Sequence, residues 1–192
     1  MAGRPRTIDR DHVLDAAEAV VAEVGAGGLT IDAVARAAGI TKGGVQYCFG
    51  SKDDLIAAML RRWGAEFDAT LQRLAGDDPG PDRRLAAYLQ ATRDGSQAES
   101  SREAVMLAAL VQARGNLSET RAWYRRQMDA LGDPQTPEGR RRRLALLASE
   151  GAFLLRGFGF LEIGEDEWRA LFDDIARLAE GGEEPPPDGS AR

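Results

Sequence analysis

Apolar residues recur along most of the chain at the three- and four-residue spacing of amphipathic helices. The first such pattern spans 13–24, and Gly25 follows it as a C-terminal stop. Thr30 is placed to cap a second, short helix that ends at Gly39, and Thr41 to cap a third. The inward positions of the first two helices are Val13, Ala17, Val20, Val24, Ile31, Val34, Ala35 and Ala38. The N-terminal part is therefore expected to consist of three short helices.

The fourth helical pattern is much longer and begins at Ser51, where Asp54 three residues later completes a capping-box pattern. At 1.5 Å per residue this helix is expected to extend over roughly 36 Å. Its apolar positions are Leu55, Met59, Trp63, Phe67, Leu71 and Leu74. Further helices are expected at about 82–93, from Ser100 with Glu103 as a second capping box, and at 117–131, 137–157 and 165–179. The pattern thus predicts an all-α fold of about nine helices.

The three short helices, with a tight turn at 38–40, match the helix-turn-helix arrangement, whose second helix lies in the DNA major groove. Gln46 can pair with adenine, and the Tyr47 hydroxyl can reach a phosphate. Lys42 and Lys52 offer positive charge to phosphates. The residues expected to face the core of this unit are Ile40, Val45 and Phe49. The candidate DNA-binding residues are Arg6, Thr30, Thr41, Lys42, Gly43, Gly44, Gln46, Tyr47 and Lys52.

The net charge of −6 is unevenly distributed along the chain. Residues 1–52 contain six basic and six acidic residues, so the whole acidic excess lies in 53–192. An acidic protein can therefore still present a locally basic face to DNA. A phosphate-binding P-loop is disfavoured, because the glycines at 39–50 lack its spacing and no strand precedes them. A plain surface turn would explain the glycines, but not the caps, the core positions and the outward polar residues together.

Several other classes of protein are disfavoured by what the chain contains. One cysteine, Cys48, cannot form an internal disulfide, which fits a reducing cytoplasm. One histidine, His12, cannot build a histidine-rich zinc site or a paired Glu-x-x-His di-iron site. The longest apolar run, 104–111, is far shorter than the roughly 20 residues of a membrane span, and the N-terminus lacks a secretory signal. We therefore expect a cytoplasmic protein with no cofactor, no metal site and no membrane association.

The segment from about Ile8 to Leu60 resembles the DNA-binding domain of the TetR/AcrR family of bacterial transcriptional regulators. The residues that carry the resemblance are VLDAAEAVVAEVGAGGLTIDAVARAAGITKGGVQYCFGSKDDL (13–55). The family pattern Gly-Val-Ser-Lys-Gly-x-Leu-Tyr-x-His/Tyr-Phe-x-x-Lys falls on residues 39–52. Gln46 replaces the usual tyrosine, which follows as Tyr47, and Cys48 replaces the usual histidine or tyrosine. Cys48 is either a buried core residue, the more usual role of a lone cysteine, or a redox sensor on the DNA face.

The C-terminal part contains bulky apolar side chains on several helices, which either fill a core or surround a cavity. The resemblance implies an effector pocket bounded by the long fourth helix and its neighbours. The candidate ligand-binding residues are Trp63, Phe67, Tyr88, Met106, Leu110, Trp123, Met128 and Phe153. Because this set is mostly apolar and aromatic, we expect a hydrophobic or amphipathic effector.

The helix expected at 137–157 is apolar on two faces, so both faces must be buried. One face can pack on the protein's own core and the other on a second subunit. The resemblance implies a two-fold interface formed by the last two helices of each subunit. The candidate interface residues are Leu147, Gly151, Leu154, Phe158, Trp168, Phe172 and Ile175.

The sequence as a whole indicates a DNA-binding domain (1–52), a ligand-binding and dimerisation domain (53–180) and a disordered tail (181–192). We interpret it as a homodimeric repressor that leaves its palindromic operator in double-stranded DNA when it binds a small molecule. One alternative is an all-helical ligand carrier, and another is a protein-interaction module without DNA binding. An enzyme is disfavoured, because the sequence offers no nucleophile–base pair and no metal ligands.

Overall fold

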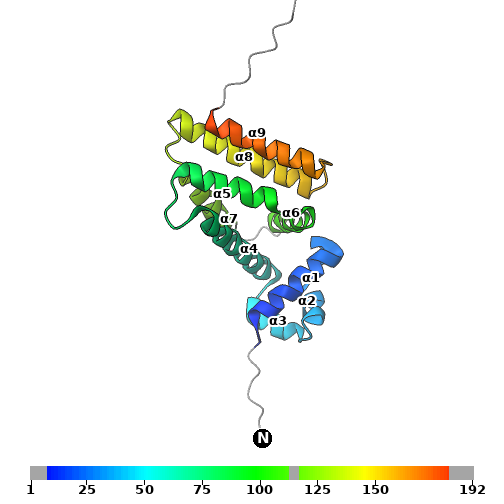
Figure 1. Cartoon of the computed structure of the whole chain (residues 1–192). Helices are drawn as coiled ribbons and strands as arrows, with labels where there is room; N and C mark the ends of the chain where they lie inside the picture. Colours follow the sequence, from blue (N-terminus) through cyan, green and yellow to red (C-terminus); the bar gives the residue numbers. More distant parts are fainter. Residues whose placement is uncertain (1–7, 113–116, 182–192) are drawn as a thin grey trace, which may run out of the picture.

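A computed structural model of the chain describes residues 8–112 and 117–181, without the side chains of residues 26 and 109–112. Within these residues it contains nine α-helices and no β-strand, so the predicted all-α fold is confirmed (Figure 1). The helices are α1 (Arg10–Gly28), α2 (Ile31–Ala37), α3 (Lys42–Phe49), α4 (Lys52–Ala75), α5 (Pro81–Asp94), α6 (Gln97–Gln112), α7 (Ser118–Asp129), α8 (Pro137–Gly157) and α9 (Glu165–Glu180). Arg6, the side chain of Leu110 and all of the predicted tail beyond Gly181 lie outside the described residues.

At four of the predicted helix starts a hydroxyl side chain accepts a hydrogen bond from a backbone N–H three residues later. Thr30 starts α2, Thr41 starts α3 and Ser51 starts α4, each with an N–H···O distance of 3.1 Å. Thr136 starts α8 in the same way, at 3.0 Å. These caps satisfy N–H groups that have no partner inside the helix, which is why the four starts could be located from the sequence.

The start of α6 differs from the prediction by one turn. The backbone N–H of Glu99 donates to the Ser96 hydroxyl (3.2 Å), and Glu99 Oε2 accepts from the Ser96 N–H (2.7 Å). This pair forms the capping box, so Ser100 lies inside the helix and donates to the Ser96 carbonyl. The sequence contains two consecutive copies of the pattern, and the upstream copy begins the helix. Glu103 is therefore not a capping residue.

The first helix is interrupted where the sequence predicted its end. Gly25 has a φ of 72° and breaks the regular helix of α1. Val13, Ala17 and Val20 are buried as predicted, but Val24 is 56% exposed, so its assignment to the core is wrong. Val24 lies beside Gly28 at the surface, where a Cβ atom on Gly28 would clash with Cγ2 of Val24.

The nine helices form two groups joined by α4. In Figure 1, α1, α2 and α3 lie at one end of the molecule, α8 and α9 lie at the other, and α4 leads from the first group toward the second. One buried core joins the first three helices to the start of α4, and a second joins the end of α4 to α5, α8 and α9. Met106 of α6 is fully buried in the first core, so α6 also contacts the N-terminal unit.

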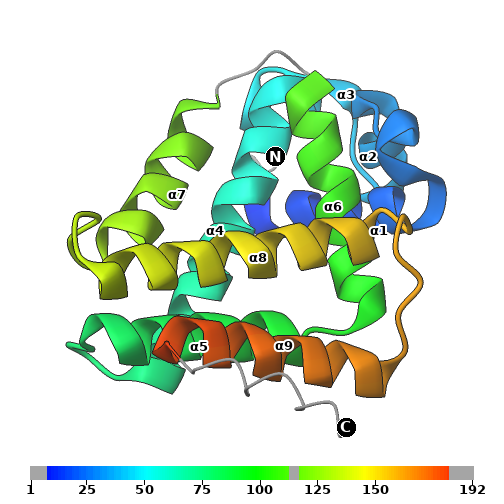
Figure 2. The ribbon, with the colours of Figure 1, turned by 90° about the horizontal axis from the view of Figure 1, so that it is seen from above.

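The helices α6 and α8 cross at very short range. A Cβ atom on Gly157 would lie 2.7 Å from the Cβ of Ala104 and 2.7 Å from the carbonyl oxygen of Ser100, so only glycine fits at this crossing. Figure 2 shows α4 between α6 and α7, with α8 running across the three. This crossing fixes the register of α6, and with it the position of Glu103.

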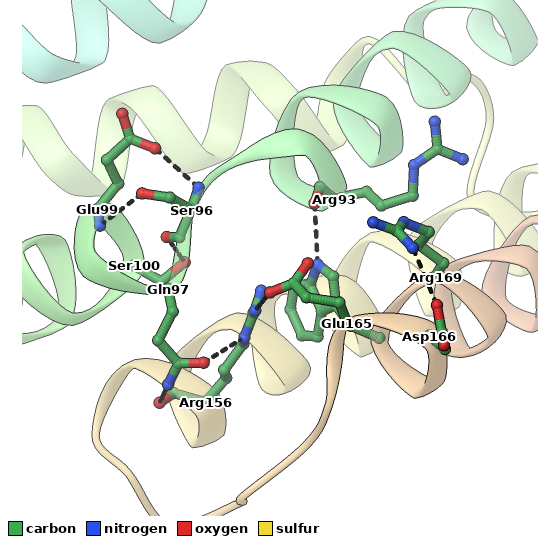
Figure 3. Close-up of polar contacts among 10 residues, drawn as sticks. Arg93, Ser96, Gln97, Glu99, Ser100, Arg156, Glu165, Asp166 and Arg169 are labelled. Carbon is green, nitrogen blue, oxygen red and sulfur yellow. Dashed lines mark hydrogen bonds and ion pairs between the residues drawn. The ribbon is translucent and has the colours of Figure 1, made fainter.

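A buried arginine connects the C-terminal end of α8 to three other helices (Figure 3). The Arg156 guanidinium donates to Gln97 Oε1 (2.9 Å) and to Glu165, and it lies 4.3 Å from the ring centre of Trp168. The indole N–H of Trp168 in turn donates to the carbonyl of Arg93 (2.9 Å). Buried charges of this kind are stable only when paired, so this cluster holds α5, α6, α8 and α9 together at one point.

Candidate DNA-binding surface and ligand cavity

The helix α3 separates polar and apolar side chains onto opposite faces, as the helix-turn-helix interpretation requires. Val45 and Phe49 are buried in the N-terminal core, and Cys48 is also buried. Gln46 is exposed, and Tyr47 is 87% exposed, which is unusual for an aromatic side chain without a partner. Thr41, Lys42 and Gly43 continue this exposed face toward the start of the helix.

Gly44 does not belong to that face. It is buried, and a Cβ atom there would lie 2.9 Å from Cδ1 of Ile8 and 3.4 Å from Cδ1 of Ile40. Its assignment to the DNA-binding set as an outward residue is therefore corrected. The absence of a side chain allows Ile8, which precedes α1, to pack directly on α3.

Two of the candidate cationic groups are present near this face. The ammonium group of Lys42 lies 2.9 Å from a carboxylate oxygen of Asp32 on α2, and both side chains are 55% exposed. Such an exposed ion pair contributes little stability, so Lys42 remains available to a phosphate. Lys52 is half-buried in the first turn of α4, and Thr30 is exposed at the start of α2.

The orientation of α3 is fixed by side chains of α1 that the sequence did not reveal. Arg10 donates to the carbonyl of Cys48 (2.6 Å), and its guanidinium lies 4.5 Å from the ring centre of Phe49. Nε2 of His12 lies 3.1 Å from the carbonyl oxygen of Ala38 at the turn between α2 and α3. These contacts cross 26 to 38 residues of sequence, so no local pattern could indicate them.

The joint between α1 and α4 consists of a compact polar group. Arg62 donates to Asp15 (2.7 Å) and to Glu18 (2.5 Å), and the indole N–H of Trp63 donates to the same Glu18 oxygen (2.9 Å). Arg62 is only 19% exposed, so these bonds are partly shielded from water. Trp63 and Glu18 also line the cavity described next.

A cavity of about 1040 Å³ lies between α4, α5, α6, α7 and α8. Five of the predicted ligand-binding residues line it: Trp63, Phe67, Tyr88, Trp123 and Phe153. Met106 and Met128 do not, and their assignment is corrected. Met106 is part of the N-terminal core, and Met128 packs against the second core. Both are apolar and lie on helices that border the cavity, but they face away from it.

The aromatic rings in the cavity wall contact one another. The ring centres of Phe67 and Tyr88 are 5.1 Å apart, and those of Phe67 and Trp123 are 6.0 Å apart. Tyr124, which the sequence analysis did not select, lies 4.9 Å from Trp123 with its ring nearly perpendicular. Rings from α4, α5 and α7 thus form one continuous aromatic surface.

The predicted ligand-binding set also omitted the carboxylate groups of the cavity wall. Glu150 of α8 accepts hydrogen bonds from the hydroxyls of Tyr88 and Tyr124, both at 2.6 Å. Burial raises the pKa of Glu150, although the two tyrosine hydrogen bonds oppose this shift. Asp68 accepts from the indole N–H of Trp123 (3.0 Å). The cavity is therefore much more acidic than the apolar set predicted.

Glu103 of α6 is a half-buried carboxyl group in the cavity wall. Burial, followed by repulsion from Glu99, raises the pKa of Glu103 to about 7. Glu150 and Glu66 add to this effect, whereas Arg102 opposes it. Glu103 therefore changes its charge near neutral pH, inside a ligand-sized cavity.

An apolar surface is exposed on α8. Leu144 and Leu147 are 56% and 54% exposed, and Phe158 and Phe160 continue this surface beyond the end of the helix. Gly151 and Leu154 are half-buried on the same helix. Exposed apolar patches of this kind are typical of subunit interfaces.

The three candidate interface residues of α9 lie elsewhere. Trp168, Phe172 and Ile175 are at most 5% exposed and pack in the second core of their own subunit. Their assignment to a subunit interface is therefore corrected. Their apolar stripe is the inner face of α9, and the outer face is mostly charged.

The described part of the chain contains neither a helix suited to spanning a membrane nor a cluster of metal-ligating side chains. Among these residues no helix is long and apolar enough to cross a membrane. Residues 8–112 and 117–181 also contain no cluster of three or more side chains suited to holding a metal ion.

Two family models match the chain. The model of bacterial regulatory proteins of the tetR family matches residues 13–59, and that of the tetracyclin repressor-like C-terminal domain matches residues 82–180. The HTH-type transcriptional regulator BetI of Burkholderia mallei (strain NCTC 10229) is 36% identical over 93 residues, which cover 48% of each chain. The match spans about half the length of this curated relative.

Solved structures resemble the whole chain. A transcriptional regulator from Rhodococcus sp. RHA1 has a TM-score of 0.66 and 30% identity, over 93% of this chain and 100% of that one. The multidrug binding protein EbrR, solved in complex with imidazole, has a TM-score of 0.61 and 20% identity, over 98% and 100% of the two chains. The second likeness is one of fold alone.

Proposed function

The chain belongs to the TetR family of bacterial regulatory proteins, and on this premise we propose that it is a DNA-binding transcriptional repressor controlled by a small molecule in its cavity. The observation that carries the proposal is the position of Trp63. Its ring lines the cavity, and its N–H donates to Glu18 of α1 (2.9 Å). An occupant of the cavity can therefore act directly on the helix that orients α3.

On the DNA side, the exposed face of α3 enters the major groove. Gln46 reads a base edge, and Tyr47 and Lys42 contact phosphates. The Lys42–Asp32 ion pair is exposed, so replacing Asp32 by a phosphate costs little. Thr41 and Gly43 border this contact, whereas Thr30 and Lys52 contact the backbone from the starts of α2 and α4.

The functional unit is a homodimer in which α8 of each subunit packs against its counterpart. The exposed leucines of α8, with Phe158 and Phe160, support this arrangement, because they would otherwise remain in water. A two-fold dimer places its two copies of α3 about 34 Å apart, in successive major grooves of a palindromic operator. Sedimentation at micromolar concentration tests this point.

Release follows from a change in the angle between α1 and α4. A ligand that displaces Trp63 breaks its hydrogen bond to Glu18, beside the Arg62 ion pairs that hold the two helices together. A shift of a few ångströms per subunit then breaks the match to the two grooves. A difference in ligand affinity of about 1–3 kcal/mol between the two states is typical of such coupling.

The proposal is tested by selecting duplexes that bind the full chain from a library with a random central region. We expect a palindromic sequence to be enriched, with two half-sites one helical turn apart. Gln46→Ala should relax the preference at one position of each half-site. Failure to enrich any sequence, with binding that depends on salt alone, would exclude a sequence-specific regulator.

A further inference from the structure

The walls of the cavity carry more negative than positive charge. Among the described residues, eight carboxylates line it, against four arginines and no lysine. Several of these charges are already compensated within the protein. Glu18 is paired with Arg62, Glu119 is paired with Arg61 (3.0 Å), and Asp68 accepts two N–H groups. The carboxylates that lack such a partner are the ones to which a ligand in the cavity can still bind.

Glu150 and Glu103 are the relevant pair. Among the described residues, no arginine or lysine nitrogen lies within ion-pair distance of either carboxylate. In the described part of the chain Glu150 accepts from two tyrosine hydroxyls, and a carboxylate can accept about four hydrogen bonds. Burying a carboxylate without a cation beside it raises the free energy of the folded protein. This arrangement therefore favours a positively charged ligand.

The tyrosines also orient Glu150 toward the aromatic surface. Tyr88 and Tyr124 donate to different oxygens of the carboxylate, which places it between rings from α5 and α7. The ring centres of Tyr88 and Trp123 are 6.4 Å apart, and Phe67 contacts both rings. A cation is attracted to the faces of such rings, most strongly where water is excluded.

We propose that the effector is an organic cation with apolar substituents, bound between these rings with its charge next to Glu150 and Glu103. This inference rests on the proposed function, which places the effector in the cavity. An anion of the same size would meet two uncompensated carboxylates. A neutral molecule would leave both carboxylates without a cation, and Glu150 with its two tyrosine hydroxyls alone.

Two probe ions of nearly equal size and shape but opposite charge separate these possibilities. Tetraphenylphosphonium is the cation and tetraphenylborate the anion, and each is titrated into the full chain in a sodium buffer by calorimetry. We expect the cation to bind at least tenfold more tightly than the anion. Equal affinities, or tighter binding of the anion, would overturn the proposal.

The variant Glu150→Gln tests whether the carboxylate of Glu150 attracts the cation. The amide keeps the size of the side chain and can still accept from a tyrosine, but it removes the charge. We expect the affinity for tetraphenylphosphonium to fall at least tenfold, whereas the affinity for tetraphenylborate stays the same or rises. The matched control is Glu119→Gln, which removes a carboxylate of the same cavity that is already paired with Arg61. This control should change cation affinity less than twofold.

Circular dichroism shows whether Glu150→Gln folds. If it does not, Glu103→Gln is the second variant, and its affinity for tetraphenylphosphonium should fall at least threefold. Unchanged cation affinity in the folded variants would refute the inference. The calorimetry uses no DNA, so it is independent of the duplex selection. A chain that selects an operator but prefers the borate ion remains a repressor with a different effector. A chain that binds the phosphonium ion through Glu150 but selects no duplex keeps the cation site and loses the proposed function.

Discussion

The DNA-facing unit and the cavity both present charged side chains, but in different environments. Lys42 and Asp32 form an ion pair whose two side chains are 55% exposed, so water and salt screen it. Glu150 lies in the wall of a cavity and accepts hydrogen bonds from two tyrosine hydroxyls. The first arrangement suits a surface that exchanges one partner for another at little cost. The second suits a site that discriminates strongly by charge, since an unmatched charge there is expensive.

The two regions also differ in how completely they are packed. The N-terminal core contains Val13, Val34 and Val45 with no exposed surface. The C-terminal part surrounds a cavity of about 1040 Å³ with aromatic rings as well as charged side chains. The same residue type therefore has different consequences in the two places.

Replacing one phenylalanine in each region tests this difference in packing. We expect these variants to show the largest change in the free energy of unfolding. Phe49→Ala removes a ring from a closed core and should lower the free energy of unfolding by about 3–5 kcal/mol. Phe153→Ala removes a ring that already faces the cavity, so it creates little new void and should cost about 1.5–3 kcal/mol. Urea denaturation of both variants gives the two values. Equal losses would mean that the cavity wall is as tightly packed as the core.

The second prediction concerns the pH dependence of stability, through Glu103. Its pKa is about 7 in the folded protein and about 4.5 without the fold, so the folded state retains a proton that the unfolded state loses in this range. Stability should therefore fall as the pH rises from about 4.5 to 7 and change no further above it, by about 1–3 kcal/mol. Glu103→Gln should remove this loss, as urea midpoints between pH 5 and 8 would show.

Glu99 provides the control, four residues earlier on the same helix. Hydrogen bonds from the Ser96 backbone and side chain lower the pKa of Glu99, so its contribution has the opposite sign. That contribution is present above the unfolded pKa and is lost as the pH falls. Glu99→Gln should therefore destabilise the protein at neutral pH, where Glu103→Gln stabilises it. The same sign for both variants would contradict the assignment of the capping box to Ser96.

This pair of glutamates illustrates what the sequence can and cannot predict. Caps such as Thr41 and Thr136 act within three residues, so their positions follow from local pattern. The pattern Ser-x-x-Glu occurs twice in succession at the start of α6, and local rules do not decide between the copies. The first turn of the observed helix also packs on α8, where Gly157 lies against Ala104 and the Ser100 carbonyl, a contact that no local rule describes.

The acidic character of the cavity could not be predicted from local sequence patterns, because it depends on contacts between residues far apart in the chain. Glu150 meets Tyr88 across 62 residues and Tyr124 across 26, and Trp123 meets Asp68 across 55. Each of these carboxylates looks like an ordinary surface residue in the sequence. The apolar members of the cavity, such as Phe67, were predictable because helical periodicity indicates which face of α4 turns inward. Periodicity could not distinguish a cavity wall from a core, as Met106 shows.

The third prediction tests the exposed region through DNA affinity. Gln46→Ala should cost about 1–3 kcal/mol on the selected duplex and relax the preference at one base pair. Lys42→Ala should weaken all duplexes alike and reduce the slope of log K against log salt by about 1. Asp32→Ala is the matched control, because it releases Lys42 from its ion pair and should leave DNA binding equal or stronger. Anisotropy titrations at several salt concentrations distinguish these outcomes, and no loss in either of the first two variants would reject the assigned face.

The smallest expected effect lies at the joint between the two regions. Trp63→Phe keeps an aromatic ring in the cavity wall but removes the N–H that donates to Glu18. A single hydrogen bond to a charged group contributes about 1.5–3 kcal/mol at most, and Arg62 still holds Glu18, so the net change should be about 1 kcal/mol. DNA affinity without ligand should hardly change, because α3 keeps its contacts to Arg10 and His12.

The effect of Trp63→Phe should instead appear in the coupling between ligand and DNA, measured as the ratio of tetraphenylphosphonium affinities with and without saturating duplex. Since linkage is reciprocal, the same ratio describes the effect of the ligand on DNA binding. A ratio that is the same in the variant and the natural chain would show that the signal between cavity and DNA-binding unit bypasses Trp63, leaving the contact of α6 with the N-terminal core as the route.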